Sequence, residues 1–152
     1  MDETNYYLFI VGKQMDDEGA DIASKAIFGK LIATGSWYLA DYTAFRRDYK
    51  PGDRIVFYLA GRGSRYFVGT AVVAGAVVEV GKANRGILCD FGLYGYKYEL
   101  PLSDIVVWDN PKPIKPMVPD LAFIKDKRYY GLHLRQGAAR ISESDYRLIV
   151  EC

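Results

Sequence analysis

Trp37 is the residue of this chain best suited to hold a flat ligand, because it follows a glycine at a break in the predicted helical pattern. An indole exposed at such a break can stack on a nucleic-acid base, a contact that contributes about 1–3 kcal/mol. Lys13 and Gln14 follow the first predicted strand, and a glutamine can form two hydrogen bonds with a base edge. On spacing alone, the alternatives are a core Trp37 and a solvated strand end at Lys13 and Gln14.

Arginines on a predicted helix and beside a predicted hairpin loop could hold phosphates, because arginine forms paired hydrogen bonds with phosphate oxygens. Arg46 lies on a predicted helix, and Arg62 and Arg65 flank the glycine of a predicted hairpin loop. Charged hairpin tips also serve solubility, so this reading stays open. Tyr58, in the strand that precedes the hairpin, projects from the face opposite to its two neighbours. It could reach a binding site or be an ordinary half-buried tyrosine.

Motifs for metal binding and catalysis are missing from the sequence. One histidine and two cysteines are too few for a closed zinc site. The chain has no Gly-Lys-Thr phosphate loop, no Gly-x-Gly-x-x-Gly fingerprint and no His-Glu-x-x-His motif. His133 has no serine or cysteine paired with it in sequence, and Cys89 in an apolar segment is expected to be an inert core thiol. We therefore expect no metal and no cofactor, and a binding domain rather than an enzyme.

The composition suits a polyanion that carries stacking bases. Aromatic residues make up 14% of the 152 residues, and 13 of them are tyrosines. Residues 1–21 hold six acids and one base, so the remainder carries 19 bases against 13 acids despite a net charge of only +1. The acidic start is not a signal peptide, and no apolar run is long enough to cross a membrane. We expect a cytoplasmic protein without membrane contact.

The chain predicts a single domain over residues 1–152, because no linker, repeat or low-complexity tract divides it. Glycines within the strand-like segments are typical of bulges and barrel corners. A proline-rich stretch at 110–119 is expected to cross the surface in an extended form. The fold class is α+β, a small curved β-barrel of five to six strands with flanking helices. We predict helices at 22–32, 42–49 and from 144, and strands at 6–11, 54–60, 66–80, 87–91, 94–100, 105–108 and 129–135.

The order of several motifs resembles the EVE domain of the PUA-like superfamily, whose close relative is the YTH domain. The resemblance spans nearly the whole chain. The segment Gly-Ser-Trp at 35–37 resembles the glycine-x-tryptophan that places a cage tryptophan in the YTH pocket. Segments 50–58 and 67–73 resemble the family's Lys-x-Gly-Asp strand and the strand that follows it. The other matching segments are the opening strand at 7–12 and the closing unit at 121–124 and 141–146.

The resemblance implies a pocket that takes one modified base flipped out of DNA or RNA. The loop at 81–86 lacks the second aromatic of the YTH cage, so a modified cytosine in DNA fits better than a methylated adenine. Such a reader is associated with a separate effector, for example a nuclease. The implied pocket residues are Trp37, Lys13, Gln14, Tyr38 and Tyr58, and the implied phosphate contacts are Arg46, Arg62 and Arg65.

Two other functions stay open. Related small barrels of the ASCH type are thought to hydrolyse amides on modified nucleosides with a lysine, an acid and a hydroxyl. Lys13 could pair there with Glu99 or Asp109, although the spacing typical of that family is absent. A third reading is a protein-interaction domain with a vestigial pocket.

Overall fold

The computed structural model describes residues 4–12, 14–15, 21–41, 43, 47–61, 64–134 and 137–152. A seven-stranded sheet has the strand order β4-β8-β6-β5-β1-β9, with β7 pairing to β8, and β2 and β3 form a separate hairpin. The strands are β1 (Tyr6–Val11), β2 (Gln14–Met15), β3 (Asp21–Ile22), β4 (Ser36–Ala40), β5 (Arg54–Leu59), β6 (Tyr66–Val73), β7 (Val78–Glu79), β8 (Tyr96–Pro113) and β9 (Ala138–Ile141).

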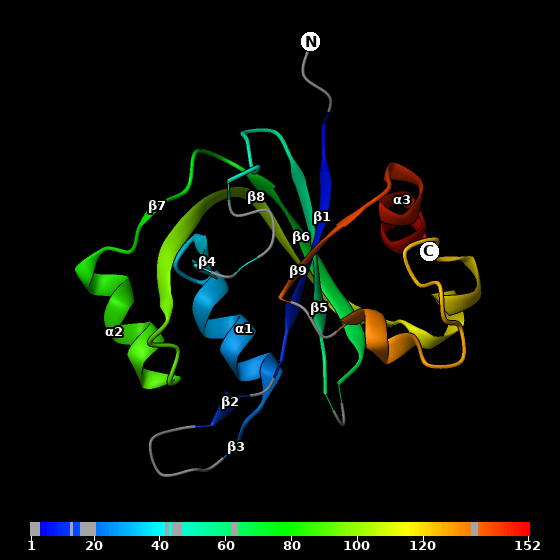
Figure 1. The fold of residues 1–152 in the computed structure, drawn as a ribbon, viewed down its shortest axis with the longest axis horizontal. Coiled ribbons are helices and arrows are strands. Elements are labelled where there is room, and N and C mark those ends of the chain that lie inside the picture. Colours follow the sequence, from blue (N-terminus) through cyan, green and yellow to red (C-terminus); the bar gives the residue numbers. More distant parts are fainter. Residues whose placement is uncertain are drawn as a thin grey trace.

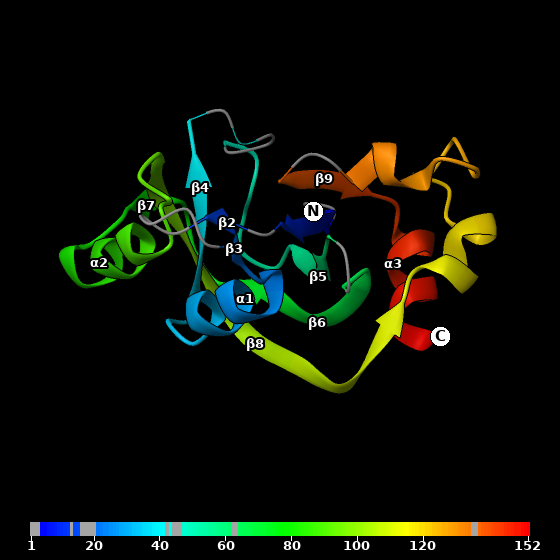
Figure 2. The same ribbon diagram turned by 90° about the horizontal axis from the view of Figure 1, so that it is seen from below.

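Helices cover the curled sheet from two sides. The α-helices are α1 (Ser24–Ile32), α2 (Lys82–Asp90) and α3 (Glu143–Glu151), and the 3₁₀ helices are η1 (Lys115–Asp120) and η2 (Tyr130–Leu134). α1 and α2 lie on one side of the central strands and α3 on the other (Figure 1). β8 bends across the molecule from the side of α2 to the side of α3 (Figure 2). The predicted α+β class with a strongly curved sheet is confirmed.

The sheet separates two hydrophobic cores, and β1 contributes to both. Tyr7, Phe9 and Val11 point into the core beneath α1, whereas Leu8 points into the core beneath α3 and η1. This division follows from the alternation of side chains along a strand. Because both faces of β1 are covered, the strand has a continuous apolar sequence from Tyr6 to Val11.

The Lys-x-Gly-Asp segment is a structural turn. The Asp53 carboxylate is fully buried and accepts hydrogen bonds from the backbone N–H of Asn5 and of Lys50, both at 3.1 Å. The Lys50 ammonium lies 2.7 Å from the same carboxylate. Gly52 has φ +94°, a conformation that glycine adopts without strain. The motif therefore joins the start of β5 to the start of β1, and its four residues need not touch a ligand.

A serine caps the helix of the closing strand–helix unit. The Ser142 hydroxyl accepts a hydrogen bond from the backbone N–H of Asp145 at 3.1 Å, which caps α3. The buried Asp145 carboxylate accepts the N–H groups of Ala122 and Phe123 at 2.8 and 2.9 Å. α3 is thereby fixed to the segment that follows η1.

Several predicted elements differ in the structure. Residues 82–90 form α2 rather than a loop and a strand, and Leu88 packs from this helix into the core. The helix is too short for the spacing of its apolar residues to distinguish it from a strand. Residues 130–134 form η2 rather than a strand. Part of the proline-rich stretch is η1, which buries Met117 and Val118. Half of the predicted helix at 42–49 lies outside the described residues, and Arg47 and Asp48 lie in a turn.

Candidate functional site

Trp37 lies in an aromatic cluster at the interface of α1 and the sheet. Its ring centroid is 5.0 Å from that of Phe57, 6.0 Å from Phe28 and 6.3 Å from Phe9. Only 7% of the residue is exposed. The indole is thus held by neighbours from α1, β1 and β5, and only a small part of it reaches the surface.

The end of α1 determines where Trp37 lies. Gly35 has φ +81° and its N–H donates to the carbonyl of Ile32 at 3.1 Å, which ends the helix as predicted. The chain then enters β4, where Trp37 is paired with Leu100 of β8. The sequence prediction placed Trp37 at a break between two helices and missed β4. All five residues of β4 are buried, so the strand has no polar alternation that would reveal it.

Tyr38 follows Trp37 in β4 and points to the opposite face of the strand. Its hydroxyl lies 2.5 Å from the hydroxyl of Thr34, and only 2% of the residue is exposed. Burial raises the pKa of Tyr38, an effect that the hydrogen bond with Thr34 partly offsets. Tyr38 therefore fixes the short connection from α1 to β4, the strand that carries Trp37.

Alkaline pH is expected to destabilise the protein through four buried tyrosines. Burial is the largest cause that raises the pKa of Tyr7, Tyr38, Tyr49 and Tyr58 above 10.0. Since the unfolded chain loses these protons more readily, the free energy of unfolding falls as pH rises above that value. A phenolate absorbance titration should show these four of the 13 tyrosines ionising only together with unfolding. Smooth ionisation of all 13 in a folded protein would contradict the burial.

Tyr58 is not brought together with Trp37. Its side chain lies in the core beneath α3 and η1, where its ring centroid is 5.2 Å from that of Phe67. Phe57, which contacts Trp37, precedes it in β5 and points the other way. Tyr58 is 2% exposed. Tyr58 and Trp37 therefore belong to different hydrophobic cores.

The chain between β1 and α1 connects the two elements that surround Trp37. Lys13 and the side chain of Gln14 lie outside the described part of the chain. The backbone of Gln14 belongs to β2 and pairs with Ile22 of β3, directly before α1. The segment that carries Lys13 and Gln14 therefore starts at the carboxyl end of β1, and the hairpin that follows leads into α1.

Arg65 is the one predicted phosphate contact whose position is described, since Arg46 and Arg62 lie outside those residues. It is exposed at the start of β6, and its N–H donates to the carbonyl of Leu59 at 2.7 Å. Its φ of +78° is uncommon for a residue with a side chain. The hairpin thus holds an exposed arginine in a conformation that costs local stability.

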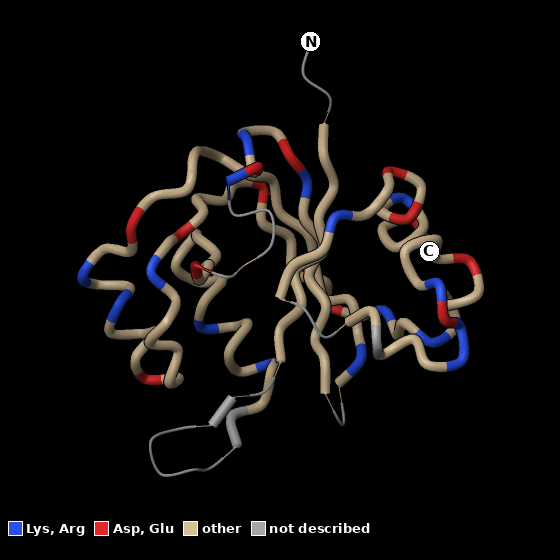
Figure 3. The backbone as a smooth tube through the Cα atoms, in the orientation of Figure 1, with Lys and Arg blue, Asp and Glu red and all other residues tan. Residues whose placement is uncertain are grey.

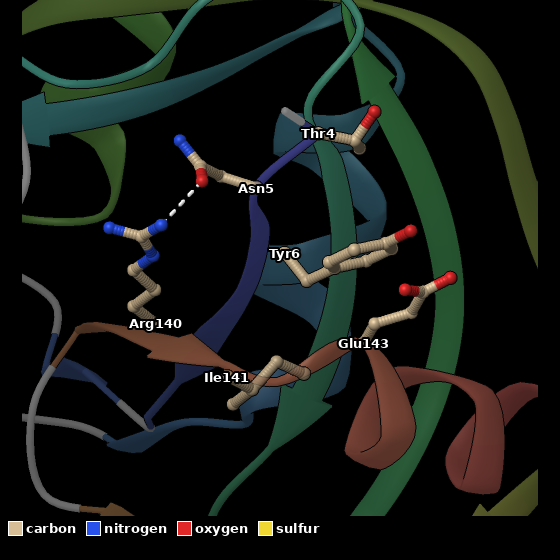
Figure 4. Close-up of a pocket in the computed structure, with 6 residues that line it drawn as sticks. All are labelled: Thr4, Asn5, Tyr6, Arg140, Ile141 and Glu143. Carbon is tan, nitrogen blue, oxygen red and sulfur yellow. Dashed lines mark hydrogen bonds between the residues drawn. The ribbon is translucent and has the colours of Figure 1, made fainter. Parts of the chain in front are cut away.

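A polar depression of about 540 Å³ lies at the start of β1, between Thr4, Asn5, Tyr6, Arg140, Ile141 and Glu143. In Figure 4, Asn5 and Arg140 point toward one another, and the Arg140 guanidinium donates to the Asn5 amide oxygen at 2.5 Å. Tyr6 alternates with Tyr7 and Phe9 along β1, so it faces away from the Trp37 side. Of the predicted pocket residues whose side chains the structure describes, Trp37, Tyr38 and Tyr58, none lines this depression.

Within the described residues, the structure groups no set of three His, Cys, Asp or Glu side chains that could hold a metal ion. His133 accepts a hydrogen bond from the backbone N–H of Asp126 at 3.0 Å. Glu99 accepts the N–H of Gly81 and the Asn84 amide at 3.1 and 3.3 Å, so it holds the start of α2. Across the same residues, no helix is long and apolar enough to span a membrane.

Comparison with known proteins shows the family to which this chain belongs. The family model of the EVE domain matches residues 33–152, which include Trp37 and the Asp53 turn. The chain belongs to the EVE domain family. A UPF0310 protein of Pyrococcus abyssi is 30% identical over 103 residues, which cover 66% of this chain and 72% of that protein. A UPF0310 protein of Bacillus licheniformis is 51% identical over 39 residues, and this match spans only 26% of its length.

Solved structures share this EVE fold at low sequence identity. Human THYN1 in complex with DNA containing 5-methylcytosine has a TM-score of 0.62 at 9% identity, over 97% of this chain and 96% of that one. The N-terminal domain of Thermococcus gammatolerans McrB bound to m5C DNA has a TM-score of 0.59 at 12% identity, over 97% and 96%. The YTH domain of Zygosaccharomyces rouxii MRB1 in complex with N6-methyladenosine RNA has a TM-score of 0.59 at 14% identity, over 96% and 85%. These likenesses confirm the predicted PUA-like fold.

Proposed function

We propose that this EVE domain binds nucleic acid and recognises one modified base, a modified cytosine in DNA, in a pocket beside Trp37. The observation that carries the proposal is the match of nearly the whole chain to domains solved with 5-methylcytosine DNA. The aromatic cluster around Trp37 supports it, because base recognition by flipping relies on stacking against aromatic side chains.

The proposed site uses Trp37 as its wall and the segment after β1 as its polar edge. The exposed part of the indole meets the base, while Phe28 and Phe57 hold the ring from behind. Lys13 and Gln14 supply hydrogen bonds to the base edge. Tyr38 stays bonded to Thr34 and positions the start of β4. Because Trp37 is largely buried, the base enters by moving side chains at the cluster surface rather than by filling an open slot.

The size of the expected selectivity follows from the chemistry of one methyl group. Burying a CH₂-sized group contributes about 0.8 kcal/mol, which is roughly fourfold in affinity. A pocket that also forms hydrogen bonds with the base edge should prefer the modified base by more than this factor. Releasing the base from a duplex costs a few kcal/mol, so single-stranded DNA should bind more tightly than duplex DNA of the same sequence.

A titration with short oligonucleotides tests the proposal. The strands differ only in a central cytosine, 5-methylcytosine, 5-hydroxymethylcytosine, adenine or N6-methyladenine, as DNA and as RNA, at one stated salt concentration. We expect one modified cytosine to bind about tenfold more tightly than cytosine, a difference of about 1.4 kcal/mol. Equal affinity for all strands, or no binding, would overturn the proposal.

Arg65 is proposed to contact a phosphate next to the bound base. Arg65→Gly removes the charge and also relieves the positive φ, so we expect unchanged or higher thermal stability together with weaker DNA binding. The loss should be equal for modified and unmodified strands, since a phosphate contact carries no base information. Unchanged affinity in a stable variant would remove Arg65 from the interface.

We also propose that the domain acts with a separate effector such as a nuclease. The support is the likeness to N-terminal domains of McrB, which are parts of a larger protein. The expected result is that the isolated chain binds modified plasmid DNA but leaves it intact, as gel electrophoresis would show. Cleavage by the purified chain alone would contradict this division of labour.

A further inference from the structure

We propose that the outer face of α1 and α2 binds the phosphate backbone of the nucleic acid that flanks the bound base. This inference rests on the proposed function and adds a second contact surface to it. The two helices lie side by side on the same flank of the molecule in both views (Figures 1 and 2). We call this surface the helical face and define it by Lys25, Lys30, Lys82 and Arg85.

The helical face carries an excess of positive charge. All four of its bases are exposed, and none forms an ion pair with another residue that the structure describes. Asp90 is the only acidic residue of the two helices. Figure 3 shows basic positions along both helices. A surface with four exposed bases is complementary to a chain of phosphates.

The residues between these bases are small. Ala26 and Gly29 are the exposed neighbours of the two lysines on α1, and Ala83 and Gly86 are those of the bases on α2. Within each helix, the exposed residues between the two bases are therefore small. A backbone with phosphates can approach both helices closely, and each ammonium or guanidinium group can reach it by extending over its small neighbours.

Helix stability does not account for where these charges lie. Lys25 and Lys82 are in the first turns of their helices, and neither first turn contains an acid. A positive charge at a helix amino terminus interacts unfavourably with the helix dipole. Residue types that oppose local helix stability are expected where a side chain serves binding. At α1 a bound polyanion would compensate for the unfavourable charge, whereas at α2 the Glu99 carboxylate already lies at the amino terminus.

The helical face is continuous with the proposed pocket. α1 begins directly after the β2–β3 hairpin that follows Gln14, and it ends shortly before Trp37. Its inner side contacts Trp37 through Phe28, with ring centroids 6.0 Å apart. Its outer side carries Lys25 and Lys30. A strand that leaves the pocket therefore reaches these lysines after crossing about one helix diameter, roughly 10 Å.

A matched pair of double variants tests this surface. Lys25→Gln/Lys82→Gln removes two charges from the helical face. Lys115→Gln/Lys125→Gln removes two exposed charges from the flank that carries η1 and α3. Both proteins are titrated across a range of salt concentrations with unmodified and modified single strands of about four and about sixteen nucleotides. Thermal unfolding of each variant is recorded beside wild type.

The helical-face variant should bind the long strands about tenfold more weakly, and the slope of log K against log salt should shrink by about 0.7 per lost contact. It should bind the short strands as wild type does, and its Tm should be equal or higher. The control variant should match wild type in every titration.

If both variants bind the long strands alike, the helical face is not a binding surface. If the helical-face variant loses affinity but wild type shows no preference for a modified base, the surface stands and the proposed reader function fails. If the preference is present and the variant keeps full affinity for long strands, the reader stands and this inference fails.

Discussion

Gly69→Ala is expected to lower the free energy of unfolding by at least about 3 kcal/mol, the upper end of the cost of overpacking a tight site. A Cβ atom at this position would lie 2.1 Å from the carbonyl oxygen of Val106 and 3.1 Å from the Cα of Val107. Both atoms belong to the backbone of β8, so no side-chain rotation can relieve the clash. β8 would have to move away from β6 at a point where their register already shifts.

Urea denaturation measures this loss, and Gly86→Ala is its matched control. Gly86 lies within α2, and no atom outside the helix backbone lies within 4 Å of a Cβ built there. Alanine at this position should raise the free energy of unfolding by about 0.5–1 kcal/mol because glycine is a poor helix former. Equal stabilities of Gly69→Ala and wild type would mean that β6 and β8 do not approach each other as the structure shows.

Trp37→Ala is expected to cost about 3–5 kcal/mol of stability, because a large buried aromatic side chain is lost. The three aromatic neighbours of the indole belong to α1, β1 and β5, so the cavity would open between elements that the tryptophan joins. Trp37→Phe keeps a ring in the cluster and should cost much less. Denaturation curves of both variants check this order, and a cost below about 1 kcal/mol for alanine would show that the indole is not part of the core.

Trp37 is both a core residue and the proposed stacking surface, so its substitution can weaken binding in two ways. The alanine variant loses folded protein as well as the proposed stacking surface, so weaker binding by that variant has two explanations. The phenylalanine variant removes the second ring and the N–H of the indole, while a six-membered ring keeps the cluster filled. Binding of modified bases is therefore best compared between wild type and Trp37→Phe.

Much of the fold could be predicted because its signals are local. β1 and β5 are continuous apolar runs, α1 ends at Gly35, and α3 begins at a serine cap. Elements whose existence depends on tertiary contacts could not be predicted. β4 is buried on both faces, and α2 is a nine-residue helix held by Leu88 and the Glu99 carboxylate. Neither has a period long enough to separate helix from strand.

The candidate site was harder to predict than the fold, and β5 shows why. The alternation of side chains correctly places Phe57 and Tyr58 on opposite faces of the strand. It does not say what covers each face. The proline-rich stretch, expected at the surface, contributes Ile114 and Met117 to the core that buries Tyr58. Which face of a strand meets a ligand depends on such distant segments, and no local pattern encodes it.

The most direct test of the account is the ratio of the dissociation constants for a strand with a central cytosine and one with a central 5-methylcytosine. It is measured for wild type and Trp37→Phe at one salt concentration, with folding of both proteins verified. The account predicts a ratio of about ten for wild type, equivalent to about 1.4 kcal/mol, and a ratio near one for Trp37→Phe, with similar affinity for unmodified DNA. A ratio that is the same in both proteins would show that Trp37 does not read the modification.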